Sequence, residues 1–229
     1  MYGNGSQTGN AIPLVMGLAE PAARPGLIDA IVADIRRRGN ALTSGDVGYR
    51  YLLRALADGG RSDVVFDMNS GSDKPGYGYQ LKMGATSLTE AWNADPASSQ
   101  NHFMLGHIME WFYHDLAGIA TDAAGPGYKK ILIAPHPVGD VTWARAKLDS
   151  VRGVISSEWK IVNGVFSLQV VIPPNTTATV SLPGASAESV KESGRPARAN
   201  EGVRFRGAEG GRLVFEVESG RYSFEVPWK

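Results

Sequence analysis

The spacing of apolar residues changes once along the chain, at Gly125-Pro126-Gly127. Before this segment apolar residues recur at helical intervals, and after it they alternate with polar residues. A period near 3.6 residues predicts amphipathic helices, whereas strict alternation predicts half-buried strands. We therefore expect a helical domain at residues 1–124 and an antiparallel β-sandwich at residues 125–229.

Four segments of the first half have helical spacing. Predicted boundaries come from glycine, which ends helices, and from serine, which caps their first turn. The longest apolar stripe predicts the clearest helix of the chain. The predicted helices are a stripe from Leu27 to Ile35 ended by Gly39, a stripe from Tyr51 to Leu56 ended by Gly59-Gly60, a short helix capped by Ser62, and a stripe from Leu105 to Ile119.

The second half contains short alternating runs separated by turn signals. Asn163-Gly164 is a strong hairpin signal between two such runs, which span residues 159–172. Residues 130–135 predict a buried strand, residues 203–217 predict two strands joined near Gly210-Gly211, and residues 222–226 predict the last strand. Trp143, Trp159 and Trp228 are predicted to be core residues rather than sugar-stacking rings.

Charge and composition exclude several kinds of partner. Lys plus Arg and Asp plus Glu both number 23, so no net positive charge favours nucleic acid or an anionic membrane. No apolar run reaches the roughly 18 residues of a membrane span, and the N-terminus lacks the pattern of a signal peptide. We therefore expect a soluble protein, and the sequence assigns it to no compartment.

Metal and cofactor sites are not predicted. The chain contains no cysteine, which excludes disulfides and thiolate sites. His107, Glu110 and His114 share one helix face at spacings of three and four, so a metal is an open alternative to the favoured solvated polar face. Neither a dinucleotide fingerprint, a phosphate loop nor a serine-hydrolase elbow occurs, so no cofactor is expected.

A single stretch carries the pattern of a sugar site. Glu90 is flanked by hydroxyl-bearing residues and followed by Trp92, and a loop then leads to the Asn101-His102 pair. A carboxylate performs proton chemistry, an aromatic ring covers the apolar face of a sugar, and polar groups hold its hydroxyls. Most other acids of the first half are expected to be solvated or to cap helices.

These motifs, taken in order, resemble the C-terminal part of bacterial α-L-rhamnosidases of glycoside hydrolase family 78. Nearly the whole chain is covered by the resemblance, which is strongest around Glu90 and His102. The matching segments are residues 7–9, 42–45, 75–79, 84–92, 101–106, 110–111, 118–119, 126–128 and 173–176.

The resemblance implies the second half of an (α/α) toroid of the six-hairpin glycosidase type, followed by a β domain. It implies hydrolysis of terminal α-L-rhamnosyl groups of glycosides or polysaccharides with inversion, with Glu90 as general base. It places His102 and Asn101 at the sugar, with Trp92 and Tyr77 at aromatic positions near it.

The chain departs from the family in two places. Thr89-Glu90-Ala91-Trp92 stands where many members have Trp-Glu-Arg-Trp, and the loop from Glu90 to His102 is short. The family's general acid belongs to the N-terminal half of the toroid, which has no counterpart here, and Asp46 does not match its motif. We therefore expect a fragment that lacks the acid, completed by the missing N-terminal half or by a homo-oligomer. The alternative is a non-catalytic carbohydrate-binding or vestigial protein.

Overall fold

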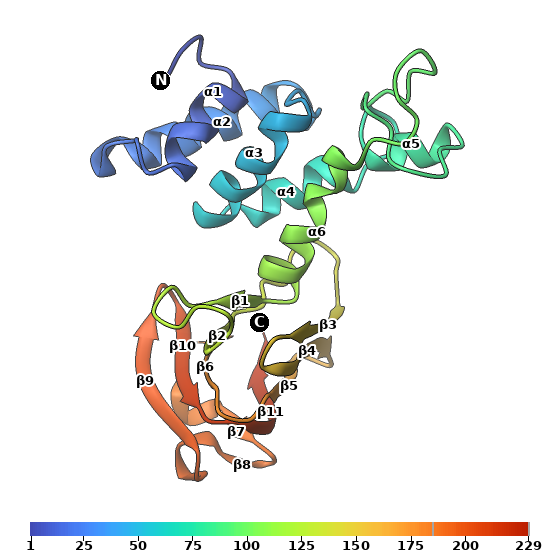
Figure 1. Cartoon of the computed structure of the whole chain (residues 1–229). Helices are drawn as coiled ribbons and strands as arrows, with labels where there is room; N and C mark the ends of the chain where they lie inside the picture. Colours follow the sequence, from blue (N-terminus) through green and yellow to red (C-terminus); the bar gives the residue numbers. More distant parts are fainter. Residues whose placement is uncertain (185, 229) are drawn as a thin grey trace. The chain divides into compact units, whose positions relative to one another are not determined.

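The computed structural model describes residues 1–184 and 186–228, and the chain forms two compact units (Figure 1). The first unit is helical and spans Met1–Trp111, and the second contains the strands and spans Phe112–Lys229. The domain division at residues 124 and 125 stays a prediction.

The helical unit consists of helices of at most 14 residues, joined by turns and loops. Its elements are α1 (Gln7–Val15), the 3₁₀ turn η1 (Pro21–Ala23), α2 (Arg24–Arg37), α3 (Asp46–Asp58), α4 (Ser62–Asn69), α5 (Tyr77–Lys82), the 3₁₀ turn η2 (Phe103–His107) and α6 (Ile108–Trp111).

The helix α2 forms for the reasons that its sequence indicates. Its apolar stripe is buried, and its last turn carries Arg36 and Arg37. Gly39 follows with φ +64°, and the amide of Asn40 returns to the carbonyl of Ile35. This left-handed turn satisfies carbonyls that the helix end leaves free, so the predicted end at Gly39 is confirmed.

The predicted cap at Ser62 is wrong. Ser62 is the first residue of α4 and makes no capping hydrogen bond. Its hydroxyl accepts a hydrogen bond of 3.1 Å from the indole Nε1–H of Trp111. A contact across 49 residues of chain therefore replaces the local one that the sequence pattern favours.

The helix predicted from Leu105 to Ile119 is confirmed only as far as Leu116, and most of it is not α-helix. The chain forms η2, one turn of α6 and a π-helical turn, η3 (Phe112–Leu116), before it leaves helical structure. Gly118 then adopts φ +79° against the backbone of residues 134 and 135. This close approach ends the helix, and Ile119 begins strand β1 instead.

The second unit is a β-sandwich whose two sheets face each other in Figure 1. One sheet has the order β1-β2-β6-β10-β9, and the other has the order β3-β4-β5-β11-β7-β8. The strands are β1 (Ile119–Thr121), β2 (Lys130–Ile133), β3 (Trp143–Ser150), β4 (Gly153–Val162), β5 (Val165–Ile172), β6 (Thr177–Pro183), β7 (Lys191–Glu192), β8 (Arg195–Pro196), β9 (Val203–Glu209), β10 (Arg212–Val217) and β11 (Gly220–Pro227), with 3₁₀ turns η4 (Ala187–Ser189) and η5 (Ala197–Ala199).

The strand predictions are confirmed, with one exception in direction. The hairpin of β4 and β5 turns at Asn163 and Gly164, which have φ of +50° and +72°. Strands β9 and β10 pair across Gly210-Gly211. The predicted sandwich is entirely antiparallel, but β2 pairs with β6 in parallel, and the three strands β3, β4 and β5 of the other sheet lie between them in the chain.

One apolar core lies between the sheets and contains residues of both. Trp159 is fully buried in it, and Trp228 packs against Phe166 with ring centroids 5.9 Å apart. Trp143 is different, since it is 65% exposed on β3. The core prediction therefore holds for Trp159 and Trp228 and fails for Trp143.

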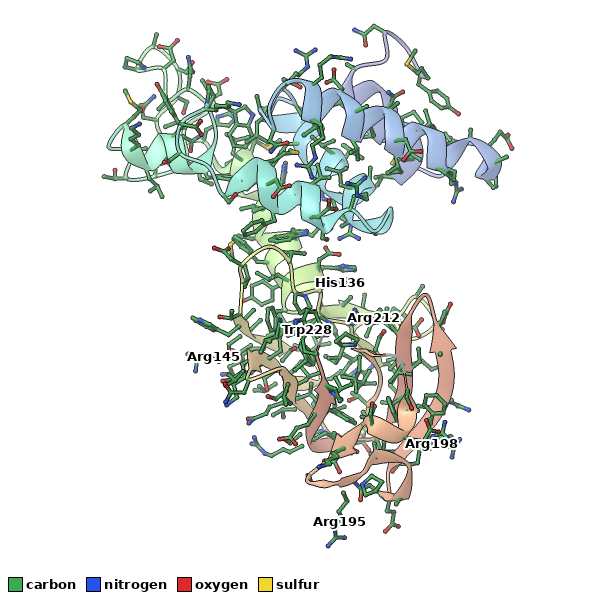
Figure 2. All side chains as sticks on the ribbon, turned by 180° about the vertical axis from the view of Figure 1, so that it is seen from behind. His136, Arg145, Arg195, Arg198, Arg212 and Trp228 are labelled. Carbon is green, nitrogen blue, oxygen red and sulfur yellow. The ribbon has the colours of Figure 1, made fainter. Side chains whose placement is uncertain are left out.

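A half-buried arginine, Arg212, lies at one end of the sandwich. Figure 2 shows Arg212 beside His136, whereas Arg195 and Arg198 lie at the opposite end. The Arg212 guanidinium donates to the carbonyls of Pro135 and Ser181 at 2.9 and 2.6 Å. Burial lowers the pKa of Arg212 to about 10. These contacts join the segment after β2 to β6 and β10, so Arg212 has a structural role.

None of the described helices has the length and apolar character needed to cross a membrane.

Candidate active site

The loop of residues 84–103 is built from two arms that run in opposite directions. The amide of His102 donates to the carbonyl of Leu88 at 2.8 Å, and the amide of Glu90 donates to the carbonyl of Ser99 at 2.9 Å. The Ser87 hydroxyl adds a bond of 2.6 Å to the carbonyl of Gln100. Glu90 and His102 therefore lie on facing arms of one loop.

The Glu90 carboxylate is exposed and is held from within this loop. Its Oε2 accepts a hydrogen bond of 3.2 Å from the Ser99 amide, the same residue whose carbonyl binds the Glu90 amide. This reciprocal pair fixes the direction of the side chain without burying it. A carboxylate held in this way can accept a proton from a water molecule beside it.

The tip of the loop is held by Asp95. Its Oδ1 accepts from the Ala97 amide at 2.9 Å, and its carbonyl accepts from the Gln100 side chain at 2.8 Å. The Ser98 amide reaches the same carbonyl at 3.0 Å. The short loop is therefore closed by its own polar groups.

Three aromatic rings support the arm that carries Glu90. Trp92 packs edge-to-face on Tyr49 and Tyr77, with centroids 4.9 and 5.1 Å apart. Its indole Nε1–H donates to the carbonyl of Ser44 at 2.8 Å. Such ring pairs contribute about 0.5–1.5 kcal/mol beyond the area that they bury, so the cluster anchors the arm to α3.

Tyr77 joins this cluster to the other arm. Its hydroxyl donates to the carbonyl of Leu105, just beyond His102. Burial raises the pKa of Tyr77, so the phenol stays neutral and keeps its proton for this bond. The polar atoms of Tyr77 and Trp92 thus point into the protein, while both side chains remain half-buried.

His102 is held by Asp46, the first residue of α3. The imidazole Nε2 lies 3.2 Å from Asp46 Oδ2, and Asp46 Oδ1 accepts the Val47 amide at 2.8 Å. The Val47 N–H, followed by the His102 imidazole, holds the pKa of the Asp46 carboxyl below its ordinary value. Asp46 is therefore ionised at neutral pH.

One turn after Asp46 in α3, Arg50 contacts α6, the helix that follows His102 and η2 in the chain. Its guanidinium binds both oxygens of Glu110 at 2.8 and 3.2 Å. Burial and the nearby Arg50 lower the pKa of His107. Glu110 is thus engaged by an arginine, and within residues 1–184 and 186–228 no group of three metal-ligating side chains lies close enough to hold a metal ion.

The structure brings most of the candidate residues into this one region. Glu90 and His102 share the loop, and Tyr77 and Trp92 share the ring cluster beneath it. Asn101 is exposed next to His102, and its amide lies 3.4 Å from the Ser99 hydroxyl. Their roles at a sugar stay predictions.

Sequence reasoning missed two supporting residues. Asp46 was noted only as a carboxylate without the acid's motif, and no local signal pairs it with His102, 56 residues away. Tyr49 is fully buried at the centre of the ring cluster. Its helical spacing to Leu52, Leu53 and Leu56 would have indicated that burial.

Comparison with known families accounts for the chain as far as residue 196. Residues 1–116 match the bacterial α-L-rhamnosidase 6 hairpin glycosidase domain, and residues 118–196 match the bacterial α-L-rhamnosidase C-terminal domain. The predicted fold class, helices of a six-hairpin glycosidase followed by a β domain, is confirmed.

Individual relatives agree with the family match. An α-L-rhamnosidase of Streptomyces avermitilis is 34% identical over 96% of this chain and 21% of its own length. One of Formosa agariphila is 29% identical over 97% of this chain and 25% of its own length. The chain therefore spans about a fifth to a quarter of these relatives.

Solved structures share the arrangement. The Streptomyces avermitilis α-L-rhamnosidase complexed with L-rhamnose superposes with a TM-score of 0.88 at 34% identity, covering 97% of this chain and 22% of that one. The α-L-rhamnosidase from Dictyoglumus thermophilum gives 0.86 at 30% identity, covering 97% and 25%.

Proposed function

The chain belongs to the bacterial α-L-rhamnosidase family, and from this premise we propose that it carries the general-base side of an inverting glycosidase site. The substrate is a terminal α-L-rhamnosyl group of a glycoside or polysaccharide. The observation that carries the proposal is the exposed Glu90 carboxylate, held by the Ser99 amide and facing the arm of His102.

Glu90 acts on water rather than on the sugar. In an inverting glycosidase a carboxylate takes a proton from the water that attacks the anomeric carbon, on the face opposite to the departing group. This step needs an ionised, solvent-accessible carboxylate in a fixed direction. The reciprocal hydrogen bonds with Ser99 supply the direction, and the exposure supplies the water.

The remaining candidate residues bind the sugar. His102 and Asn101 hold hydroxyls, because both lie on the arm opposite Glu90 and carry polar atoms. Trp92 and Tyr77 form the wall behind the loop, with their ring faces as the apolar part. The L-rhamnose bound to the relative from Streptomyces avermitilis supports rhamnose as the terminal sugar.

Asp46 does not supply the second carboxyl group of the reaction. The general acid must be protonated, and Asp46 has a lowered pKa and both oxygens engaged by Val47 and His102. Inverting enzymes place the acid roughly 6.5–9.5 Å from the base. We propose that the acid comes from a polypeptide segment outside this chain, either the remaining part of a rhamnosidase or a second copy.

A substrate that does not require the acid tests Glu90 directly. In 2,4-dinitrophenyl α-L-rhamnoside the leaving phenolate is stable without protonation, so the base alone can support hydrolysis. We expect Glu90→Gln to lower the rate of dinitrophenolate release by about 10²–10⁴-fold. Asp95→Asn is the matched control, since Asp95 is a carboxylate of the same loop that also accepts a backbone amide.

The alternative is a protein that binds carbohydrate without hydrolysing it. The engagement of both Asp46 oxygens favours it, because the carboxylate beside His102 is then structural. Equal rates for wild type and Glu90→Gln, with L-rhamnose binding retained in both, would support this alternative and refute the catalytic role of Glu90.

A further inference from the structure

The contact between Asp46 and His102 has a chemical consequence for the sugar site. We propose that Asp46 is a positioning residue, whose carboxylate keeps the proton of His102 on Nε2 and leaves Nδ1 free to accept a hydrogen bond from a sugar hydroxyl. Only the hydrogen bond from the sugar depends on the proposed function. The positioning of the His102 ring by Asp46 follows from the geometry alone.

The proton is assigned by the chemistry of the partner. An ionised carboxylate is an acceptor only, so an imidazole nitrogen 3.2 Å from Asp46 Oδ2 must donate. In a neutral imidazole the second nitrogen is then an acceptor. Among residues 1–184 and 186–228, Nδ1 of His102 has no hydrogen-bond partner, and the side chain is 25% exposed.

Both partners are fixed by their own backbones. Asp46 stands at the first turn of α3, where the Val47 amide binds its other oxygen and the helix N-terminus favours negative charge. His102 is tied to Leu88 through its amide at 2.8 Å. Its ring stacks on that of Phe103, with centroids 6.5 Å apart. The imidazole is thus held at one nitrogen and open at the other.

An isosteric substitution of Asp46 should exchange the donor and acceptor roles of the two ring nitrogens of His102. In Asp46→Asn the carboxamide oxygen stays on the Val47 amide, which is the shorter contact and lies at a helix N-terminus. The carboxamide NH₂ then faces Nε2 and donates to it. The imidazole proton must move to Nδ1, which can no longer accept a hydroxyl proton.

Long-range ¹H–¹⁵N NMR of the uniformly ¹⁵N-labelled full chain reads the tautomer. At about pH 8, where an ordinary histidine is neutral, we expect His102 Nε2 to show the shift of a protonated ring nitrogen in wild type. In Asp46→Asn the shifts of Nε2 and Nδ1 should exchange. Asp63→Asn is the matched control, because Asp63, like Asp46, binds a first-turn amide of its own helix, but its side-chain partner is Arg61 and it does not touch His102.

Titration with L-rhamnose separates the inference from the function on which it rests. We expect Asp46→Asn to weaken L-rhamnose binding about fivefold, the effect of one ordinary hydrogen bond, while Asp63→Asn binds like wild type. An unchanged His102 tautomer in Asp46→Asn, with the fold intact, overturns the positioning role. A reversed tautomer with unchanged L-rhamnose affinity instead overturns the sugar contact of His102, which belongs to the proposed function.

Discussion

The β-sandwich and the loop of residues 84–103 are stabilised in different ways. In the sandwich one apolar core runs between two sheets and includes Trp159, Phe215 and Phe224, all fully buried. In the helical unit, the loop of residues 84–103 is attached by the ring cluster around Trp92 and by single polar contacts, such as Trp92 to Ser44 and His102 to Asp46. Phe103, beside His102, is 82% exposed.

This difference separates scaffold from site. A core built from apolar area tolerates small changes in polar groups but not in volume or backbone approach. A loop held by hydrogen bonds keeps its polar side chains accessible, and a change in one partner alters their direction. Substitutions should therefore affect mainly folding in the sandwich and mainly binding or chemistry in the loop.

The largest effect that we expect compares two glycines with similar backbones. Gly118 and Gly84 have φ of +79° and +86°, so alanine is strained at both by about 1–2 kcal/mol. A Cβ at Gly118 would also overlap backbone atoms of Ala134 and Pro135, whereas nothing lies near a Cβ at Gly84. Urea unfolding should show a clearly larger loss of stability for Gly118→Ala.

The comparison of glycines has a simple way to fail. If Gly84→Ala destabilised the chain as much as Gly118→Ala, backbone strain alone would explain both, and the close packing of Gly118 against the segment after β2 would make no measurable contribution. Amide NMR signals of β1 and β2 identify which unit unfolds.

A smaller effect should appear in acid. Hydrogen bonds from Val47 and from Arg61 lower the pKa values of Asp46 and Asp63 below the ordinary 3.8. At higher pH both carboxylates are ionised in the folded and unfolded chain, and their stabilisation is complete. Below about pH 3.8 the unfolded chain binds protons first, so stability is lost as the pH falls through the folded pKa values.

The sandwich should respond less to the same acid. There the pKa of Glu188 is lowered by the Ser186 hydroxyl, but this carboxylate is fully exposed and screened by solvent. Hydrogen exchange at about pH 6 and about pH 3 should show protection lost in α3 and α4 before β4 and β5. Loss in the sandwich first would contradict the comparison.

The sequence predicts the sandwich better than the site, because local patterns specify hairpins whereas the site depends on contacts between distant segments. Alternation from Phe166 to Ile172, and a turn at Asn163-Gly164, specify a hairpin locally. The π-helical turn at Phe112–Leu116 and the strand at Ile119 depend on the approach of residues 134 and 135, which no local pattern contains.

The candidate site shows the same limit. Glu90 and His102 were found by motif, because their neighbours in the chain are part of the pattern. The partner of His102 is 56 residues away, and the partner of Trp92 is a backbone carbonyl 48 residues away. A carbonyl carries no side-chain signal, so only the folded chain reveals what holds the loop.

Azide offers the most direct measurement of whether Glu90 is a general base. Azide is already an anion and needs no base, and Glu90→Ala leaves space for it. With 2,4-dinitrophenyl α-L-rhamnoside, azide forms the new bond to the anomeric carbon as dinitrophenolate departs with the bonding electrons. We expect Glu90→Ala to be reactivated by azide and to yield β-L-rhamnosyl azide by inversion. An α-configured azide, or no azide product, would contradict the account.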